Sequence, residues 1–467
     1  MRTRAVSPLE VVEAHLRQIE QVNPSLNAIV TIADSAPDRA RVAEAAVISK
    51  SEVGVLHGLP LTVKDTIDTK GLRTTSGSQL RNQHIPGHDA TVIARLKSAG
   101  AIILGKTNTS EMAIPYETDN PVFGLTNNPH DLTRTPGGSS GGEAAAIAAC
   151  FSPAGIGSDL SGSIRVPAHF CGIVGLKPTT GQVPMDGHWP AATGPLSLGA
   201  CIGPMARRVI DLALLFSVMA DELPIEVSAS EFAQNAHRRL NGLQVAYYPN
   251  DGIVPVTEDT ARAIAAAAKV LADAGLIVRE ERPPAVSEGS RLWIELFSQT
   301  ASEQLREFYR GHEEAAGPRV SAILRRQTED ATLENRIKTA ERLAQAIVER
   351  ERRREDLLAW MKTTPLFLAP VGAVPAFEHG AERVKVNDEL ISTFRAFSYS
   401  QTFNVFGLPA VSVPIARSSE GLPVGVQIVG RPFEEDRVLA AAAIIEESVA
   451  DGTHASGVQQ HARDVRT

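Results

Sequence analysis

The chain has 467 residues, of which 43% are hydrophobic and 21% charged, so it can bury a large core and is not predominantly disordered. Its formal net charge of -8 argues against a nucleic-acid partner, because such partners are bound by clustered lysine and arginine. Three cysteines are too few for a disulfide framework, and no stretch has the roughly 18 uninterrupted apolar residues of a membrane span. We expect a cytoplasmic protein with no metal site and no membrane partner.

The N-terminal half alternates helices with short apolar strands. A helix is predicted from Ser7, where apolar residues recur at helical spacing, and an alanine-rich helix follows over 38–50. The segment LPLTVKD, which begins at Leu59, indicates a buried strand. The alternation continues with a helix over 91–99, a strand from Ala101, a helix from Glu143 and a strand from Ser152. This order predicts an α/β sheet covered on both faces.

The C-terminal half returns to strands after a helical segment. Residues 259–362 are expected to be mainly helical and to end in a long helix over 333–361. The strands PLFLAPV, AVSVPI and PVGVQIVG follow, and a short polar loop between the last two predicts a hairpin. Because no internal repeat or low-complexity linker divides the chain, we expect a single elaborated domain.

Two short motifs match known patterns without the context that those patterns need. GAIILGKT, residues 100–107, fits a phosphate loop, but the residues between its glycines form an apolar run that must itself be a strand. GGSSG, residues 137–141, fits the nucleophile elbow of α/β hydrolases, which requires a buried strand before the serine. The preceding NNPHDLTRTP is polar and broken by prolines, so we interpret both matches as accidental.

The informative stretch is GGSSGGEAAAIAACFSPAGIGSDLSGSIRVPAHFCGIVGLKPT, from Gly137 to Thr179. Two glycine-serine loops flank a small-residue helix and a short strand, a layout that brings Ser139 and Ser163 together. This stretch resembles the amidase signature. The resemblance extends to GLPLTVKDTIDTKGLRTTSGS, to GKTNTSEMAIPYETDNPVFGLTNNP, and near the C-terminus to GLPAVSVPI and GLPVGVQIVGRPFEEDRVL.

The resemblance to the amidase signature family implies one large α/β/α sandwich around a mixed, mainly parallel central sheet over 1–467. Its expected parts are N-terminal helices over 1–55, a signature core over 56–223, a variable helical segment over 224–361, and strands and a helix that return to the sheet over 362–450. The resemblance also implies that an upstream helix of the family is missing here.

Three residues match the catalytic set of the family: Lys64 in the VKD motif, Ser139 in GGSSGG and Ser163 in SGSIR. Amide hydrolysis needs an activated nucleophile, a stabilised oxyanion and a proton for the leaving nitrogen. A buried lysine can be neutral and accept a proton, so Lys64 can draw the proton of Ser163 through Ser139. In the family a cis peptide bond precedes the residue that corresponds to Ser139.

Further site residues follow from the resemblance. The backbone N–H groups of the turn formed by Leu160, Ser161, Gly162 and Ser163 are expected to make the oxyanion hole. The expected remaining residues are Asp159 and Arg165 as braces of this turn, Ser140 as a support, and Ala113, Tyr116 and Trp189 as walls of the substrate pocket. For Asp159 and Arg165 the alternative is ordinary surface ion pairing, and for Tyr116 and Trp189 it is a place in the core.

The turn departs from the family at Ser161, where the usual pattern D-x-G-G-S has glycine. Glycine is favoured where the backbone approaches a ligand closely or takes a positive φ, and a serine there adds a Cβ. We expect Ser161 to narrow the oxyanion hole and slow the enzyme. The alternative is that its hydroxyl adds a donor or lines the pocket.

These residues predict a serine amidohydrolase that uses no cofactor and cleaves small aliphatic or aryl amides, or esters or carbamates, through an acyl-enzyme. Three alternatives stay open: an amidotransferase A-type subunit that hydrolyses glutamine, a thiol amidase with Cys171 as nucleophile, and a non-catalytic binding protein on the same fold. The expected partners are a small-molecule amide and a second copy of the chain in a homodimer, with no nucleic acid.

Overall fold

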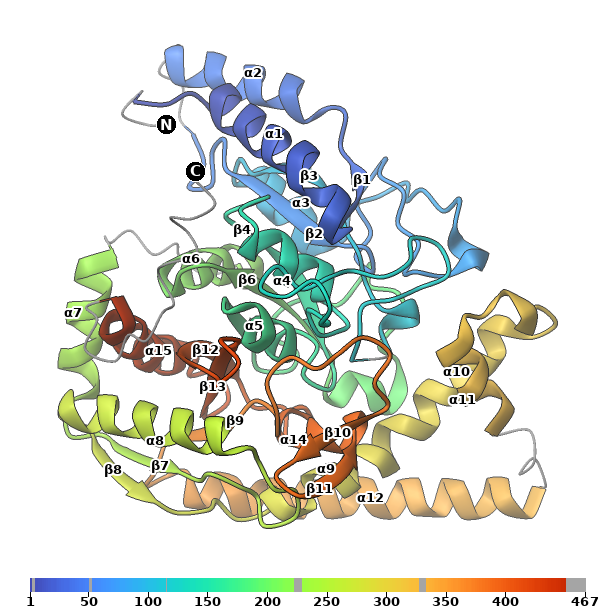
Figure 1. Ribbon diagram of the computed structural model, residues 1–467, viewed down its shortest axis with the longest axis vertical. Helices are drawn as coiled ribbons and strands as arrows, with labels where there is room; N and C mark the ends of the chain where they lie inside the picture. The colour runs from blue at the N-terminus through green and yellow to red at the C-terminus, as the bar shows by residue number, and fades with distance from the viewer. Residues whose placement is uncertain (2–4, 50–52, 115, 222–228, 327–332, 451–467) are drawn as a thin grey trace.

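A computed structural model describes residues 1, 5–49, 53–114, 116–221, 229–326 and 333–450 of the chain (Figure 1). Within these ranges one sheet has eleven strands, and a separate pair, β10 (Arg383–Val386) and β11 (Glu389–Ser392), forms a small hairpin. In spatial order the large sheet consists of β1 (Ile29–Ile32), β3 (Ile102–Thr107), β2 (Pro60–Lys64), β4 (Ala154–Asp159), β6 (Cys201–Ala206), β5 (Val174–Lys177), β12 (Ala410–Arg417), β13 (Pro423–Gly430), β9 (Leu366–Pro370), β7 (Gln244–Tyr247) and β8 (Ile277–Glu280).

The sheet is mixed, as predicted, but not mainly parallel. Among the described residues six of the ten strand pairings are antiparallel, and the four parallel ones join β2 to β3 and β4, and β7 to β8 and β9. The predicted hairpin is present, with Val413 opposite Val426 in the antiparallel pair β12–β13. The expectation that parallel pairings predominate was wrong because strand direction depends on the path of the connections, which a hydrophobic pattern does not record.

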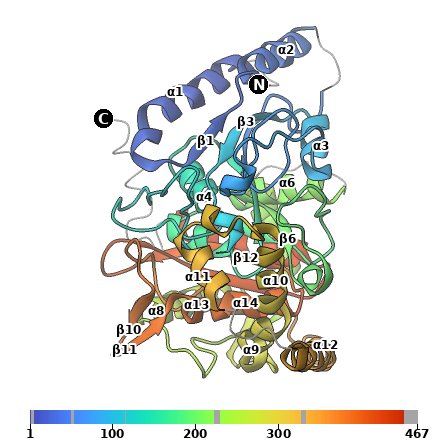
Figure 2. The ribbon, with the colours of Figure 1, turned by 90° about the vertical axis from the view of Figure 1, so that its right-hand side faces the viewer.

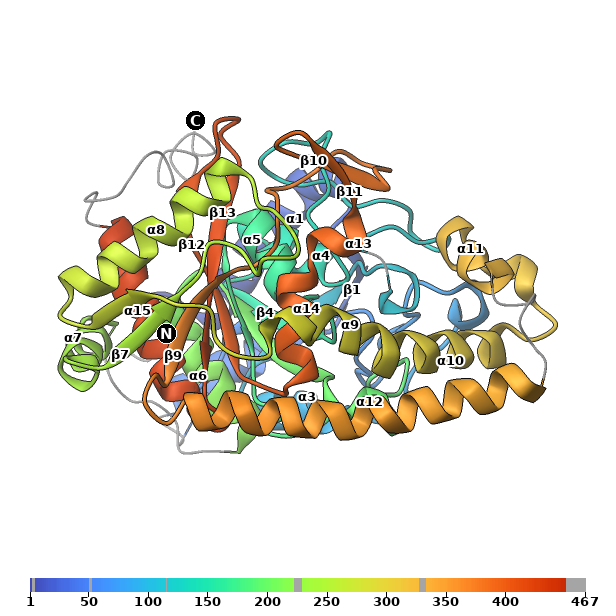
Figure 3. The ribbon, with the colours of Figure 1, turned by 90° about the horizontal axis from the view of Figure 1, so that it is seen from below.

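Helices cover both faces of the sheet (Figure 3). The α-helices of the described ranges are α1 (Pro8–Leu26), α2 (Ala36–Ile48), α3 (Thr91–Ser98), α4 (Gly141–Ala148), α5 (Arg165–Cys171), α6 (Val209–Ala220), α7 (Ala229–Leu240), α8 (Glu258–Asp273), α9 (Gly289–Trp293), α10 (Gln299–Tyr309), α11 (Pro318–Arg326), α12 (Leu333–Trp360), α13 (Thr393–Ala396), α14 (Ser398–Val405) and α15 (Glu435–Ala450). The main core joins α3, α6, α8 and α15 to one face, whereas α4, α5 and α14 lie on the other. In the described ranges no helix has both the length and the apolar character that a membrane crossing requires.

Local sequence signals predict several elements closely. α1 starts after Ser7 because the Ser7 hydroxyl accepts the N–H of Glu10 while the Glu10 carboxylate accepts the N–H of Ser7, a capping box. α1 and α2 lie together at one end of the molecule (Figure 2).

Lys106, in the motif that resembles a phosphate loop, lies inside the fully buried strand β3, so this segment cannot cradle a phosphate.

The variable helical segment expected over 224–361 also contributes to the sheet. β7 and β8 belong to it and extend the sheet beyond β9, with Val245 opposite Leu366. β8 pairs with a strand on one side only and is largely exposed, so it lacks the apolar run that identified the buried strands. α12 follows as the predicted long helix along the edge of the molecule (Figure 3).

Candidate active site

Two neighbouring parallel strands deliver the central residues. β2 ends at Lys64 and β4 ends at Asp159, and Val63 pairs with Ile156 between them. Because the carboxyl ends of parallel strands meet at one edge of a sheet, the loops that follow them converge there. The loop after β4 carries Ser163 into α5.

Lys64 is completely buried at this edge. Its Nζ lies 2.7 Å from the Oγ of Ser139 and 3.0 Å from the Oγ of Ser158. Burial lowers the pKa of Lys64 to about 7, although the charges of Asp159 and Glu143 act in the opposite direction. Near neutral pH a substantial fraction of this amine is therefore neutral and able to accept a proton.

The two glycine-serine loops lie side by side. Ser139 and Ser163 both line one cavity, and the N–H of Ser140 donates to the backbone oxygen of Ser163 (3.2 Å). The Gly138–Ser139 peptide bond is cis. The structure thus brings Lys64, Ser139 and Ser163 together, with both serines on the cavity wall and the lysine in contact with Ser139.

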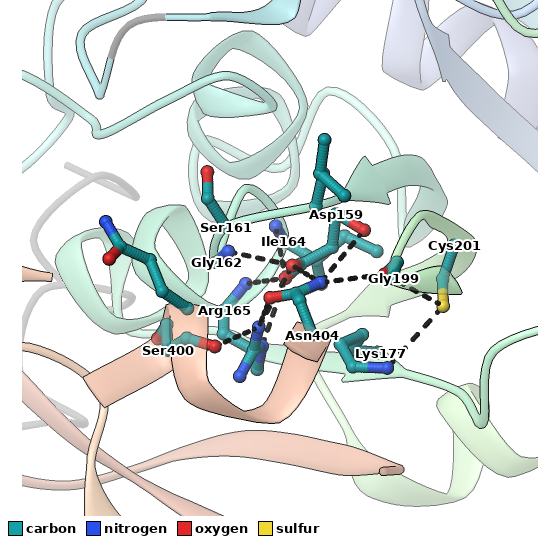
Figure 4. A network of polar contacts seen from close by, with 12 residues as sticks. Asp159, Ser161, Gly162, Ile164, Arg165, Lys177, Gly199, Cys201, Ser400 and Asn404 are labelled. Carbon is teal, nitrogen blue, oxygen red and sulfur yellow. Dashed lines mark hydrogen bonds and ion pairs between the residues drawn. The ribbon is translucent and has the colours of Figure 1, made fainter. Parts of the chain in front are cut away.

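A buried ion pair braces the loop after β4 (Figure 4). Arg165 Nε and Nη2 each lie 3.0 Å from the Asp159 carboxylate, and both side chains are inaccessible to solvent. Burial alone would raise the pKa of Asp159, but the guanidinium of Arg165 holds it well below its usual range. Asp159 also accepts the backbone N–H of Gly162 (2.8 Å) and of Ile164 (3.1 Å). Because both side chains are buried, the alternative that Asp159 and Arg165 form an ordinary surface ion pair is excluded.

The expected oxyanion turn needs one correction. The N–H of Gly162 is not available to a substrate, because the Asp159 carboxylate accepts it. Among the hydrogen bonds of the described residues, the N–H groups of Leu160, Ser161 and Ser163 donate to no protein acceptor. The available donors are therefore those three, and Leu160 and Ser163 also line the cavity.

Ser161 does not occupy the backbone conformation that favours glycine. The left-handed residue of the turn is Gly162, with φ 106°, whereas Ser161 has no positive φ. A Cβ on Gly162 would lie 2.6 Å from the Cβ of Ser400 and 3.0 Å from a methyl group of Val166. Figure 4 shows the Ser161 side chain directed away from the Asp159–Arg165 pair, and it is not among the residues that line the cavity. Of the two glycine positions in the pattern, the one at Gly162 is the one that requires glycine in this chain.

The other expected site residues divide between cavity and core. Ala113 and Trp189 line the cavity. The prediction that Tyr116 forms a pocket wall was wrong. The centroid of the Tyr116 ring lies 4.9 Å from that of Phe397, and the Tyr116 hydroxyl donates to the backbone oxygen of Ser161 (2.8 Å). Ser140 supports the site, since its Oγ donates to the backbone oxygen of Ser158 (3.3 Å).

The cavity has a volume of about 370 Å³. Its wall is mainly apolar and includes Met112, Leu160, Met185, Trp189, Leu305 and Phe308. Helix α10 supplies the last two, and the amide of Gln304 on the same helix donates to the backbone oxygen of Ala191 (3.0 Å). The described residues include no group of His, Cys, Asp and Glu side chains that could hold a metal ion.

Two site residues escaped the sequence analysis. Ser158 contacts Lys64 from the end of β4, and the Nε2 of His188 lies 2.9 Å from the Ser158 Oγ. Burial and the charge of Lys64 lower the pKa of His188 to about 4. The only sequence signal for His188 was its place directly before Trp189, which was expected to line the pocket.

The alternative nucleophile Cys171 lies outside the site. Its thiol is buried in α5, does not line the cavity, and has the backbone oxygen of Pro136 as its neighbour at 3.6 Å. Burial raises the pKa of this thiol, which disfavours the reactive thiolate.

Comparison with known proteins identifies the family of the chain. The sequence profile described as Amidase matches residues 10–439. The chain is 35% identical over 468 residues to the A-type subunit of glutamyl-tRNA(Gln) amidotransferase from Thermus thermophilus, covering 95% of this chain and 94% of the relative.

Two solved structures have the same fold. A bacterial aryl acylamidase of the amidase signature enzymes family has a TM-score of 0.84 and 26% identity, over 97% of this chain and 95% of that chain. A 6-aminohexanoate cyclic dimer hydrolase has a TM-score of 0.81 and 28% identity, over 96% and 94%. The chain therefore belongs to the amidase signature family of enzymes.

Proposed function

We propose that this amidase is a serine amidohydrolase in which Ser163 is the nucleophile, Ser139 the proton relay and Lys64 the base. The observation that carries the proposal is the contact of the buried Lys64 with Ser139. A backbone hydrogen bond joins the loop of Ser139 to the loop of Ser163, and both serines line the same cavity. A neutral amine next to a hydroxyl is a general base, and the adjoining serine is then an activated nucleophile.

The proposed reaction proceeds in two halves. Lys64 takes the proton of Ser139 while Ser139 takes that of Ser163, and the Ser163 oxygen attacks the amide carbon. The N–H groups of Leu160, Ser161 and Ser163 stabilise the oxyanion. As the C–N bond breaks, the proton returns through Ser139 to the leaving nitrogen. Water then attacks the acyl-enzyme by the same relay, releases the acid and restores Ser163.

The cavity favours a small apolar amide, aliphatic or aryl. The Trp189 and Phe308 rings lie 5.6 Å apart on its wall and offer a surface for an apolar or aromatic group. Of the charged residues that line it in the described ranges, Asp159 is paired with Arg165, and Glu307 is largely exposed and paired with Arg310. Esters and carbamates of similar shape are further candidate substrates of the same acyl-enzyme.

A glutamine-hydrolysing amidotransferase component is the second candidate, because the relative from Thermus thermophilus carries the amidotransferase name. Free glutamine has an ammonium and a carboxylate, and each costs several kcal/mol to bury without a partner. The apolar wall therefore favours hydrolysis of apolar amides.

A homodimer stays a prediction that light scattering can check.

The test is hydrolysis by the purified chain alone of anilides, aliphatic amides, an aryl ester and glutamine. Ser163→Ala should lower kcat by roughly a thousandfold or more while the melting temperature stays close to that of the wild type. Ser197→Ala is the control, because this exposed serine lies near the cavity but outside its wall. Residual Ser163→Ala activity within about tenfold of wild type contradicts the proposal. Turnover of glutamine alone favours the second candidate, and absence of all turnover favours a binding protein.

A further inference from the structure

The loop that carries His188 is fastened to the turn that follows Lys64. The Trp189 N–H donates to the backbone oxygen of Thr66 (2.8 Å), and the Asp68 N–H donates to that of Gly187 (2.8 Å). Ile67 and His188 form an antiparallel bridge between these two bonds. Backbone hydrogen bonds thus hold the His188 ring at the cavity wall beside the end of β2.

The partners of the ring define which nitrogen carries the proton. The His188 Nδ1 lies 2.8 Å from the backbone oxygen of Pro190, which can only accept, so Nδ1 bears the hydrogen. Near neutral pH the ring is uncharged, so its Nε2 has a lone pair. The Ser158 Oγ at 2.9 Å must therefore be the donor to Nε2.

This donation determines what Ser158 offers to Lys64. A serine hydroxyl has one hydrogen, and here that hydrogen is donated in the hydrogen bond to His188. Toward the Lys64 Nζ at 3.0 Å, Ser158 can then act only as an acceptor of an amine hydrogen. One N–H of the neutral Lys64 amine points at Ser158, and its lone pair is free to face the Ser139 Oγ at 2.7 Å.

We propose that His188 is a positioning residue which, through Ser158, orients the amine of Lys64 so that its lone pair receives the proton of Ser139. The inference rests on the proposed function, in which Lys64 is the base. With no acceptor at position 188, the Ser158 hydroxyl is free to turn and donate to the lone pair of Lys64. That donation competes with the one from Ser139, which is the productive one.

The surrounding charges stay the same when His188 is replaced. The charged groups that face Lys64 are Asp159 and Glu143, and the group that acts on His188 electrostatically is Lys64 itself. Because a neutral His188 contributes no charge, its replacement changes the titration of Lys64 through hydrogen bonding or through water entry. These two effects have opposite signs. Donation by Ser158 to the lone pair stabilises the neutral amine and lowers the pKa, whereas water entry raises it toward 10.5.

The experiment compares His188→Leu, His188→Gln and Ser158→Ala over a range of pH, on an anilide that the wild type hydrolyses. His188→Leu should lower the plateau kcat by about tenfold or more, with KM within about threefold of wild type. The apparent pKa of the rate should stay in place or fall. His188→Gln keeps an oxygen that can accept from Ser158, so its kcat should remain within about threefold of wild type.

A double variant separates orientation from general damage. In the Ser158→Ala background, His188→Leu should cause no further loss, because its effect passes through the missing hydroxyl. His169→Leu is the matched control: this buried histidine lies 3.1 Å from the backbone oxygen of Val374 and accepts the Gly425 N–H, and it does not line the cavity. It should lower the melting temperature without moving the apparent pKa.

The inference is overturned by a rise of the apparent pKa in His188→Leu, by equal losses with and without the Ser158 hydroxyl, or by equal losses in His188→Leu and His188→Gln. A change confined to KM also overturns it, since His188 then acts on substrate binding alone. Failure of the proposed function is recognised separately, because in that case Ser163→Ala retains the activity of the wild type.

Discussion

Tyr116 donates its hydroxyl to the backbone oxygen of Ser161 at 2.8 Å, so a buried phenol supports the turn proposed to bind the oxyanion. The amide of Gln401 donates in turn to the Tyr116 oxygen (2.9 Å). Burial raises the pKa of Tyr116 to about 12, so the hydroxyl stays protonated at any working pH. The position of Ser161 thus depends on a residue outside the cavity.

Tyr116→Phe should lower both stability and turnover. The change leaves the Ser161 oxygen and the Gln401 amide without their partner, which costs about 1–3 kcal/mol of unfolding free energy. A displaced turn weakens oxyanion binding, so kcat should fall by about tenfold while KM changes little. Denaturant unfolding and anilide kinetics measure the two effects.

The control is Tyr309→Phe. Tyr309 is also buried and donates to the Glu111 carboxylate (2.8 Å), but it neither contacts the turn nor lines the cavity. It should lose comparable stability and keep its kcat. If both variants lose the same fraction of kcat, Tyr116 has no specific link to the oxyanion turn.

The rate should depend on pH through Lys64. Its pKa is lowered from 10.5 to about 7, so below pH 7 the ammonium predominates and cannot accept the Ser139 proton. We expect kcat/KM for an uncharged amide to be low in acid, to rise through about pH 7 and to level off in alkali. Lys64→Met should lose this rise together with several orders of magnitude in rate.

Lys106→Met is the comparison for the lysine prediction. Lys106 is equally buried, and burial lowers its pKa to about 8, but it contacts Thr69 and does not line the cavity. Its removal should lower stability without moving the midpoint of the rate. A midpoint that persists in Lys64→Met assigns the base to another group.

Features that depend on neighbouring residues were predictable from the sequence. Ser7 and Glu10 cap α1 across one turn of helix, and the hairpin β12–β13 needs only a short polar loop. By contrast, Tyr116 contacts Ser161, which lies 45 residues away in the chain. His188 contacts Ser158, which lies 30 residues away. No periodicity reports such partners, so sequence reasoning placed Tyr116 in the pocket and did not single out His188.

The motif predicted which residues belong to the proposed catalytic set, but it did not predict the conformation of the turn before Ser163. Ser161 and Gly162 are adjacent, and only backbone angles reveal that Gly162 takes the left-handed conformation. The carboxylate of Asp159 determines this shape by accepting the Gly162 N–H, an interaction the sequence pattern does not display.

Arg165→Met should be severely destabilising. Arg165 is fully buried and donates to Asp159, Gln427, Asn404 and the backbone oxygen of Ser400. Removing it leaves the Asp159 carboxylate buried without its cation, which costs about 3–5 kcal/mol. Denaturant unfolding measures the loss, and activity should fall with it because Asp159 shapes the turn.

Arg262→Met tests whether the loss of stability in Arg165→Met arises from the burial of the ion pair. Arg262 pairs with Glu258 and Asp259 on α8, and its side chain is 60% exposed. An exposed pair contributes about 0–1 kcal/mol, so this variant should unfold almost as the wild type does. Similar losses in the two arginine variants are incompatible with a special role for the buried pair.

Ser161→Gly and Gly162→Ala should differ sharply, although the residues are adjacent. Ser161 has no positive φ and its side chain lies off the cavity wall, so removing it should change kcat by less than about threefold. The added backbone freedom should cost about 0.5–1 kcal/mol of stability. Gly162→Ala places a Cβ at φ 106° and 2.6 Å from the Cβ of Ser400, which must displace the turn.

A displacement of about 1 Å is enough to misplace oxyanion donors, so Gly162→Ala should lower kcat by about a hundredfold or more. The pair is measured by anilide kinetics alongside thermal unfolding, so that loss of folded protein is not mistaken for loss of rate. A Ser161→Gly variant faster than wild type by about tenfold would restore the interpretation that serine narrows the oxyanion hole. A variant slower by the same factor would mean that the Ser161 hydroxyl takes part in the site, since about 1.4 kcal/mol in the barrier is too much for a side chain that contacts no reacting group.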